Sequence, residues 1–129
     1  MFKKKIFVSF DFDNDESLKT FLLNQTRSLD CPFELPQFSF QTARSMKHWE
    51  EKTDRAIRQS DVLLVLVGLK TFSSKTVAKE IQMAKAASIP IVQIVGYREG
   101  DFHPVPNAGH LYRWQWDNLK RLIMNADSL

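Results

Sequence analysis

The sequence predicts a flavodoxin-like, doubly wound α/β domain, with a mainly parallel sheet of four to five strands and helices on both faces. Segments with the apolar spacing of strands alternate with segments that have helical spacing along the 129 residues. Two strand-like segments, Asp61–Gly68 and Ile89–Gly96, are apolar runs without alternation, which is typical of central parallel strands covered on both faces. A chain of this length has room for one core, so we expect a single domain over residues 1–129.

The first half of the chain predicts two strand–helix units. The segment "KIFVSF" (Lys5–Phe10) predicts a strand, and "DFDND" is the loop after it. The segment Phe33–Phe40 predicts a short strand at a sheet edge, because Pro36 cannot donate a ladder hydrogen bond. Helices are predicted from Glu16 onward and over Met46–Gln59. The inner stripes of these helices are Leu18, Phe21, Leu22 and Leu29, then Trp49, Thr53, Ala56 and Ile57.

The second half continues the alternation. The strand Asp61–Gly68 leads through "LKTFSSK" into a third helix, and the strand Ile89–Gly96 follows. A looser stretch, Tyr97–Gly109, precedes "HLYRW", which predicts a short last strand before a C-terminal helix. The inner stripes of these two helices are Val77, Ile81, Ala84 and Ala87, then Trp116, Leu119, Leu122, Ile123 and Ala126.

The order of the strands predicts where a ligand binds. We expect the strands Lys5–Phe10, Asp61–Gly68 and Ile89–Gly96 to be parallel and adjacent in that order. In such a sheet the ligand crevice lies outside the carboxyl ends of the strands, where the strand order reverses. The loops "DFDND" and "LKTFSSK" meet at that point, so Glu80, one turn into the third helix, lies near the crevice.

Composition excludes several classes of function. The net charge is +3 and the only basic cluster is Lys3–Lys5, so no nucleic-acid partner is expected. The single cysteine, Cys31, excludes an internal disulfide and suits a reducing compartment. The longest apolar stretch, Val62–Val67, is too short to span a bilayer, and the N-terminus lacks the apolar region of a signal peptide. We therefore expect a cytoplasmic protein without a membrane partner.

Ion and phosphate motifs do not fit the chain. The segment "DFDND" begins like a calcium loop, but Glu16 replaces the turn glycine and Leu22 replaces the bidentate acid. A glycine-rich phosphate loop is absent, and the third strand ends in Gly68, Leu69 and Lys70 rather than in a phospho-acceptor aspartate. The three histidines lack metal-ligand spacing. We therefore expect no metal and no resident cofactor.

The loop after the first strand offers a helix cap and two aromatic walls. Asp13 or Asp15 can cap the first helix through a side-chain oxygen, and we expect Asp15 to do so. Phe10 and Phe12 remain as aromatic walls for a ligand.

The segment "TFSSKTVAKEI" (Thr71–Ile81) carries the remaining candidate chemistry. Ser73 or Ser74 can cap the third helix, whose free N–H groups favour an anion such as a pyrophosphate. Glu80 can accept hydrogen bonds from a ribose diol and stabilise the positive charge that develops at the anomeric carbon during glycosidic cleavage. The alternative is a solvent-exposed glutamate on the helix surface.

Three blocks carry a resemblance to a known family: "KIFVSFDFDND", "AIRQSDVLLVLVGLKTFSSKTVAKEI" and "HLYRWQWDNLKRLI". Their order and content resemble TIR-like domains of the Thoeris ThsB type, over nearly the full length. Enzymatic TIR domains cleave NAD at the nicotinamide–ribose bond, and some cyclise the ADP-ribose into a second messenger. The resemblance implies NAD as substrate and Glu80 as the catalytic carboxylate. Thr76 stands where many members carry tryptophan, a departure that bears on substrate stacking or on the product.

The resemblance also implies the substrate-binding residues and the partners. The implied substrate-binding residues are Ser9, Phe10, Asp11, Phe12, Asp13, Thr71, Phe72, Ser73 and Ser74. We further expect self-association, in which the segment Gln41–Trp49 completes a neighbour's site, and a separate effector that senses the product. The alternative is that the Tyr97–Gly109 loop closes the site within one chain.

The resulting interpretation is an NAD-consuming TIR-like enzyme that makes an ADP-ribose-derived, cyclic nucleotide signal in anti-phage defence. Two alternatives stay open. One is a non-catalytic TIR-like module that binds protein through the same loops. The other is a nucleoside deoxyribosyltransferase-like enzyme, which shares the fold and a helix glutamate.

Overall fold

The computed structural model describes residues 3–38, 49–97, 100 and 102–128. These residues form a five-stranded sheet in the order β2-β1-β3-β4-β5, and every neighbouring pair of strands is parallel. The strands are β1 (Lys4–Phe10), β2 (Phe33–Phe38), β3 (Val62–Val67), β4 (Ile91–Val95) and β5 (Leu111–Arg113). The predicted adjacency of the first, third and fourth strands is confirmed, and so is the flavodoxin-like strand order.

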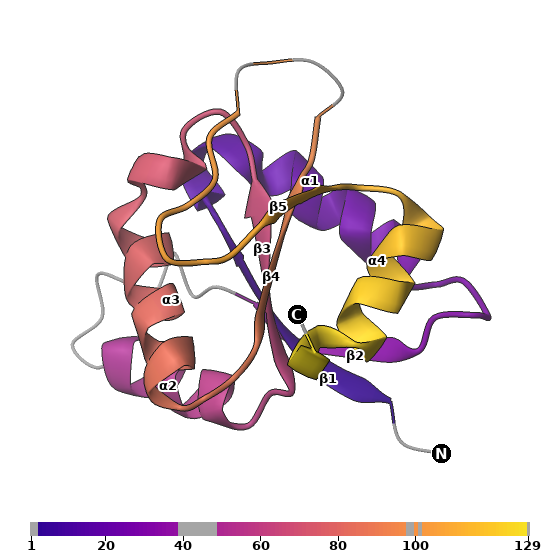
Figure 1. The fold of residues 1–129 in the computed structure, drawn as a ribbon, viewed down its shortest axis with the longest axis horizontal. Helices are drawn as coiled ribbons and strands as arrows, with labels where there is room; N and C mark the ends of the chain where they lie inside the picture. Colours follow the sequence, from indigo (N-terminus) through magenta and orange to yellow (C-terminus); the bar gives the residue numbers. More distant parts are fainter. Residues whose placement is uncertain (1–2, 39–48, 98–99, 101, 129) are drawn as a thin grey trace.

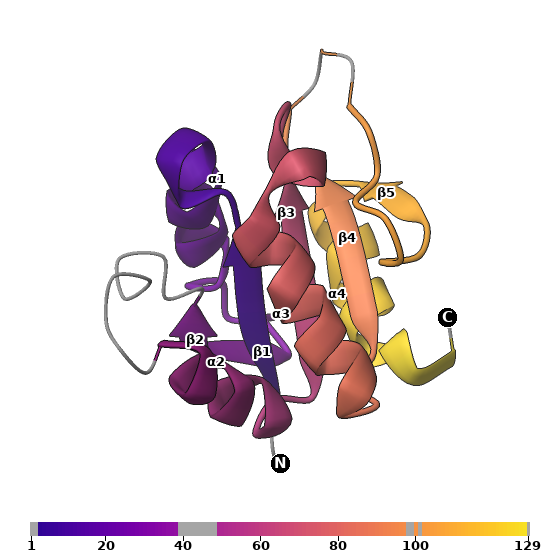
Figure 2. The ribbon, with the colours of Figure 1, turned by 90° about the vertical axis from the view of Figure 1, so that its left-hand side faces the viewer.

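Helices cover both faces of the sheet, as predicted. They are α1 (Phe12–Gln25), α2 (Trp49–Arg58), α3 (Lys75–Ala86) and α4 (Trp116–Met124), with short 3₁₀ turns η2 (Thr71–Ser73) and η3 (Ala126–Ser128). The helices α2 and α3 lie on one side of the sheet, and α1 and α4 lie on the other (Figure 1). Figure 2 views the sheet from the side that α3 covers. No helix in the described ranges is both long and apolar enough to cross a membrane.

Alternate residues of the strands fill two cores. In β1, Val8 and Phe10 pack toward α1 and α4, whereas Phe7 packs toward α2 and α3. All six residues of β3 are buried, because both faces of this central strand are covered, and this explains the absence of alternation in its sequence. In the register of β1 with β3, Ser9 pairs with Val65, a residue of the core under α2 and α3.

The start of α1 differs from the prediction. The helix begins at Phe12, and Asp11 is the flanking residue, whose carbonyl oxygen accepts hydrogen bonds from the backbone N–H groups of Asn14 (3.2 Å) and Asp15 (2.7 Å). Asp15 lies inside the helix, where its φ of −125° and ψ of 26° form a kink. The prediction that Asp15 caps the helix is therefore wrong: its side chain is buried and makes tertiary contacts instead.

Other element ends also differ from the prediction. The helix α1 ends at Gln25, so Leu29 lies beyond it and is fully exposed, and its assignment to the apolar stripe is wrong. The strand β2 lies at one edge of the sheet, as predicted. The expected start of the second helix at Met46, and residues 39–40 of the expected second strand, lie outside the described residues.

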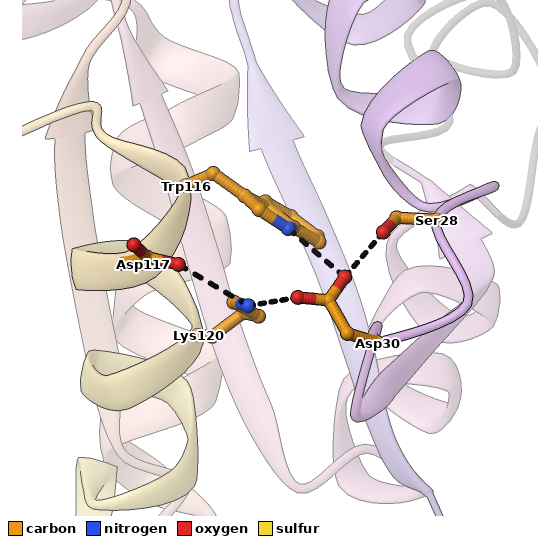
Figure 3. Close-up of polar contacts among 5 residues, drawn as sticks. All are labelled: Ser28, Asp30, Trp116, Asp117 and Lys120. Carbon is orange, nitrogen blue, oxygen red and sulfur yellow. Dashed lines mark hydrogen bonds and ion pairs between the residues drawn. The ribbon is translucent and has the colours of Figure 1, made fainter.

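A polar cluster attaches α4 to the turn after α1 (Figure 3). The carboxylate of Asp30 accepts hydrogen bonds from Lys120 Nζ, from Ser28 Oγ and from Trp116 Nε1, the last at 3.3 Å. Lys120 also lies 3.3 Å from the carboxylate of Asp117 and 5.5 Å from the centroid of the Trp116 ring. These hydrogen bonds, that of Lys120 above all, hold the pKa of Asp30 well below its usual range.

Asp30→Asn is expected to lower the free energy of unfolding slightly at neutral pH and to have less effect as the pH falls. Because the folded-state pKa of Asp30 is lowered, its charge stabilises the fold above the ordinary value of 3.8, and this stabilisation is lost as the pH falls through the folded-state pKa. The effect is small because the cluster is screened by solvent. Urea midpoints at pH 7 and at several pH values below 3.8 measure it.

Asp127→Asn serves as the control, because Asp127 is an exposed acid in η3, away from this cluster. The difference in urea midpoint between this control and the wild type should not grow as the pH rises. A difference between wild type and Asp30→Asn that stays constant over the whole pH range would show that the charge of Asp30 is not the cause.

Candidate active site

Glu80 is buried against the carboxyl end of β1. It lies on α3 with 0% of its surface exposed. The hydroxyl of Ser9, the penultimate residue of β1, donates a hydrogen bond to Glu80 Oε1 at 2.6 Å. Ser9 is also fully buried. The alternative of a solvent-exposed Glu80 is therefore wrong, and two of the predicted site residues contact each other.

Helical spacing accounts for the position of Glu80. Val77, Ile81 and Ala84 form the face of α3 that packs on the sheet. Glu80 lies three residues after Val77 and four before Ala84, and therefore shares that face. Burial of a carboxylate is costly unless hydrogen bonds compensate for the lost water. An acid at a packing position, held by a hydroxyl at the carboxyl edge of a parallel sheet, is a candidate for chemistry.

Thr76 is close to Glu80 along the same helix. It is buried in the first turn of α3, four residues before Glu80, and positions four residues apart are neighbours on a helix surface. The residue at which this chain departs from many TIR-like domains therefore lies beside the candidate catalytic carboxylate.

The hydroxyl groups of the loop before α3 contact the protein backbone. Ser74 is the N-cap of α3 and accepts a hydrogen bond from Val77 N at 3.2 Å, so of the two predicted cap candidates Ser74 is the one used. Ser73 Oγ donates to the carbonyl oxygen of Lys70 at 3.0 Å. Thr71 is buried and accepts from Gly68 N at 2.8 Å. These bonds give the loop a defined shape at the carboxyl edge of β3.

Phe72 is the predicted substrate-binding residue of this loop that has an aromatic ring exposed to solvent. It is 43% exposed, and its ring lies edge-on to His103, with centroids 5.0 Å apart. The contact joins the loop after β3 to the stretch between β4 and β5.

The candidates after β1 occupy different environments. Phe10 is 1% exposed and packs in the core under α1 and α4. Phe12 is half-buried, with its ring centroid 6.0 Å from that of Phe10. Asp11 is buried and accepts a hydrogen bond from Asn14 Nδ2 at 2.6 Å, whereas Asp13 is exposed. The predicted residues thus divide between the two faces of the sheet, with Ser9 and Glu80 on the α3 side.

Asp15 is a further buried carboxylate, and it was not predicted to bind substrate or to act in catalysis. Its Oδ1 accepts from the hydroxyl of Tyr97 at 3.0 Å, and its Oδ2 accepts from Thr71 Oγ1 at 3.2 Å. Burial raises the pKa of Asp15 above its usual value, while the two hydrogen bonds act in the opposite direction and the charge of Asp11 adds to the rise. The cluster joins α1, the loop after β3 and the stretch that follows β4.

Gly68 makes the Asp15 cluster possible. A Cβ atom at Gly68 would lie 2.3 Å from both carboxylate oxygens of Asp15, so the backbone at the end of β3 approaches that carboxylate directly. A glycine that ends an apolar strand is a signal of close backbone approach. The signal is visible in the sequence, but it does not identify the approaching residue.

A pocket of about 350 Å³ lies beside this cluster. Its described wall consists of Asn14, Asp15, Leu69, Lys70, Tyr97 and Phe102. Glu80 is not part of that wall. The pocket therefore belongs to the α1 side of the carboxyl edge, and Glu80 belongs to the α3 side. In the part of the chain that the structure describes, no three His, Cys, Asp or Glu side chains gather as a metal site.

The five-stranded parallel sheet and the buried glutamate next to the end of β1 define a TIR-like α/β domain. The family model described as Thoeris protein ThsB, TIR-like domain, matches residues 7–98. The chain therefore belongs to this family of the Thoeris anti-phage system, and the resemblance found in the sequence is confirmed. The matched range includes both Ser9 and Glu80. A search of curated proteins finds no match.

Proposed function

We propose that the chain is an enzyme that cleaves the nicotinamide–ribose bond of NAD and releases an ADP-ribose-derived, cyclic nucleotide as a signal in Thoeris defence. One observation carries this proposal: the carboxylate of Glu80 is buried at the carboxyl end of β1 and is held by the Ser9 hydroxyl. Membership of the ThsB TIR-like family supports the same chemistry.

In this proposal Glu80 stabilises positive charge in the transition state. Cleavage of the glycosidic bond passes through an oxocarbenium-like state, with charge on the anomeric carbon. A carboxylate in a buried site attracts that charge more strongly than one in water. The hydrogen bond from Ser9 fixes one carboxylate oxygen, which reduces the reorganisation that the transition state requires.

The bond changes follow from the substrate. The electron pair of the broken bond leaves with nicotinamide, which becomes neutral. A water molecule or a hydroxyl group of the same ADP-ribose then forms the new bond at the anomeric carbon and loses its proton. The second route gives the cyclic product.

The start of α3 is the proposed site for the two phosphates of NAD. The first N–H groups of a helix, together with its dipole, favour anions. Lys70 and Lys75 are exposed on either side of the Ser74 cap and add positive charge there. Phe72, exposed in the same loop, offers a ring face to the ligand.

Access to Glu80 is the reason to propose assembly. The carboxylate has no exposed surface in the isolated chain, so substrate reaches it only after a change around α3. The segment Gln41–Trp49, which we expect to complete a neighbour's site, lies outside the described residues except for Trp49. Lys79, next to Glu80, lies 5.5 Å from the centroid of the Trp49 ring and 2.6 Å from Glu50. The start of α2 is thus linked to the helix that carries Glu80.

Nicotinamide release per chain is expected to rise with protein concentration, because self-association completes the site. Trp49→Ala is expected to weaken both association, measured by light scattering, and turnover, measured as nicotinamide released from NAD. Arg44→Glu, in the same expected contact segment, should act in the same direction.

Trp116→Ala is the matched control, because Trp116 also carries a lysine 5.5 Å from its ring centroid but lies at the start of α4, on the other side of the sheet. At a temperature where both variants are folded, the control should associate like the wild type. Turnover that is independent of concentration, from a chain that stays monomeric, would overturn the assembly proposal.

A pooled-metabolite assay separates this proposal from the two alternatives. Loss of NAD with appearance of nicotinamide supports the NAD-cleaving enzyme. Exchange of bases between deoxynucleosides would identify a deoxyribosyltransferase. No change in any metabolite, even at concentrations where the chain self-associates, would identify a protein-interaction module.

A further inference from the structure

A second pocket, of about 680 Å³, lies at the carboxyl ends of β4 and β5. Its volume falls within the range of about 300–1,000 Å³ that small-molecule sites occupy. Its described wall comes from α1, from β4 with the stretch after it, and from the end of β5 with the residues that follow. The wall residues are Phe21, Val95, Gly96, Tyr97, Gly100, Phe102, Arg113, Trp114 and Gln115.

Four aromatic side chains border this pocket in two pairs. Phe21 and Trp114 meet edge to face with centroids 5.1 Å apart, and Tyr97 and Phe102 stack at 14° with centroids 6.0 Å apart. Trp114 Nε1 donates to Gln25 Oε1 at 2.7 Å, which fixes the plane of the indole. Phe21 is nevertheless 54% exposed and Tyr97 is 37% exposed. Rings that are held in place but remain exposed offer stacking surfaces to a planar ligand.

Arg113 gives the pocket a positive charge. It is the last residue of β5, beside Val95 of β4, and it lines the pocket. A guanidinium group binds carboxylates and phosphates through parallel N–H donors. The wall therefore combines stacking surfaces with an anion-binding group.

We propose that this pocket binds a small molecule in which a planar aromatic ring carries a carboxylate or a phosphate. The ring stacks on the aromatic pairs, and the anionic group binds Arg113. Glu80 lies against β1 under α3 and is not part of this wall. Arg113 and Trp114 lie beyond residues 7–98, which the family model matches. The site is therefore separate from the proposed NAD site and does not depend on NAD cleavage.

Two pairs of probes test the site: 2-naphthoate against neutral 2-naphthamide, and AMP against adenosine. Binding is followed by the indole N–H signal of Trp114 in ¹⁵N-labelled protein, which is identified by its loss in Trp114→Phe. At least one anionic probe is expected to bind about tenfold or more tightly than its neutral partner, because a charge-assisted bidentate contact is made only by the anion. The pair that shows the difference distinguishes a carboxylate ligand from a phosphate ligand.

Arg113→Gln is expected to remove the difference between anionic and neutral probes, and Arg113→Lys to retain part of it. Arg121→Gln, at an exposed position on α4 outside the wall, is the matched control and should bind like the wild type. Glu80→Gln should also bind like the wild type, whatever its effect on NAD. No shift of the Trp114 signal with either anion at millimolar concentration would overturn the proposal. So would unchanged anion binding in a folded Arg113→Gln variant.

Discussion

Glu80→Gln is expected to lower the rate of nicotinamide release from NAD by about a hundredfold or more, because loss of electrostatic stabilisation of a transition state costs at least that much. Glutamine keeps the size of the side chain and can still accept the hydrogen bond that Ser9 donates at 2.6 Å in the wild type. It removes only the negative charge. Release is measured under conditions where the wild type is self-associated.

The Glu80→Gln variant should remain folded at the assay temperature, with the circular-dichroism spectrum of the wild type. Glutamine has nearly the same shape as glutamate, and its amide oxygen can keep the hydrogen bond from Ser9, so the packing of α3 on β1 is retained. A lower rate from a variant that is fully folded at the assay temperature would separate a catalytic role of Glu80 from a structural one.

Two further variants sharpen this test. Glu16→Gln changes an exposed glutamate on α1 and should leave the rate unchanged. Ser9→Ala removes the hydrogen-bond donor that orients Glu80 and should lower the rate of nicotinamide release less than Glu80→Gln does. The double variant should be no slower than Glu80→Gln alone, because the two groups act as a unit. Wild-type nicotinamide release by Glu80→Gln would show that Glu80 is not the catalytic carboxylate.

Gly68→Ala is expected to lower the free energy of unfolding by about 1–3 kcal/mol, the usual cost of overpacking a well-filled site. The added Cβ would lie 2.3 Å from both carboxylate oxygens of Asp15. The carboxylate would have to move, and it would lose the hydrogen bonds from Tyr97 at 3.0 Å and Thr71 at 3.2 Å. Urea denaturation of the purified variant measures the change.

The cause of this loss is tested by combining two substitutions. Asp15→Ala removes the carboxylate with which the new methyl group collides. Gly68→Ala should therefore lower the free energy of unfolding much less in the Asp15→Ala background than in the wild type. Additive effects of the two substitutions would show that the collision with Asp15 is not the source of the instability. A wild-type unfolding midpoint for Gly68→Ala would contradict the close approach itself.

Much of the fold follows from patterns that act over a few residues. The apolar run of β3 predicts a central strand. When both faces of the sheet are covered, side chains on both faces of the strand are buried, so polar residues do not alternate with apolar ones. The break at Pro36 predicts that β2 lies at an edge, and the sheet order confirms it. The helical spacing of Val77, Ile81 and Ala84 predicts the buried face of α3. In each case the signal and the structure depend on the same local geometry.

The burial of Glu80 is only partly visible in the sequence. Its spacing from Val77 and Ala84 places it on the inner face of α3. The alternative of a solvent-exposed glutamate nevertheless stayed open, because charged side chains are rarely fully buried unless they have a partner. One such partner is Ser9, which lies 71 residues away in the sequence. The packing of α3 on β1 is therefore needed to show that the Glu80 carboxylate receives this hydrogen bond.

The local periodicity, the strand order and the candidate glutamate can therefore be predicted from the sequence itself. Each depends on neighbouring residues within one element or on the rules for connections between parallel strands. Tertiary structure alone decides the role of Asp15. As a residue near the start of α1, it had the properties of a helix cap. Instead α1 begins three residues earlier, at Phe12, and Asp15 is buried where Gly68, Thr71 and Tyr97 meet. These residues come from two segments that are both distant from Asp15 in sequence, the loop after β3 and the stretch after β4. A buried carboxylate is stable there only because all of them supply space or hydrogen bonds together.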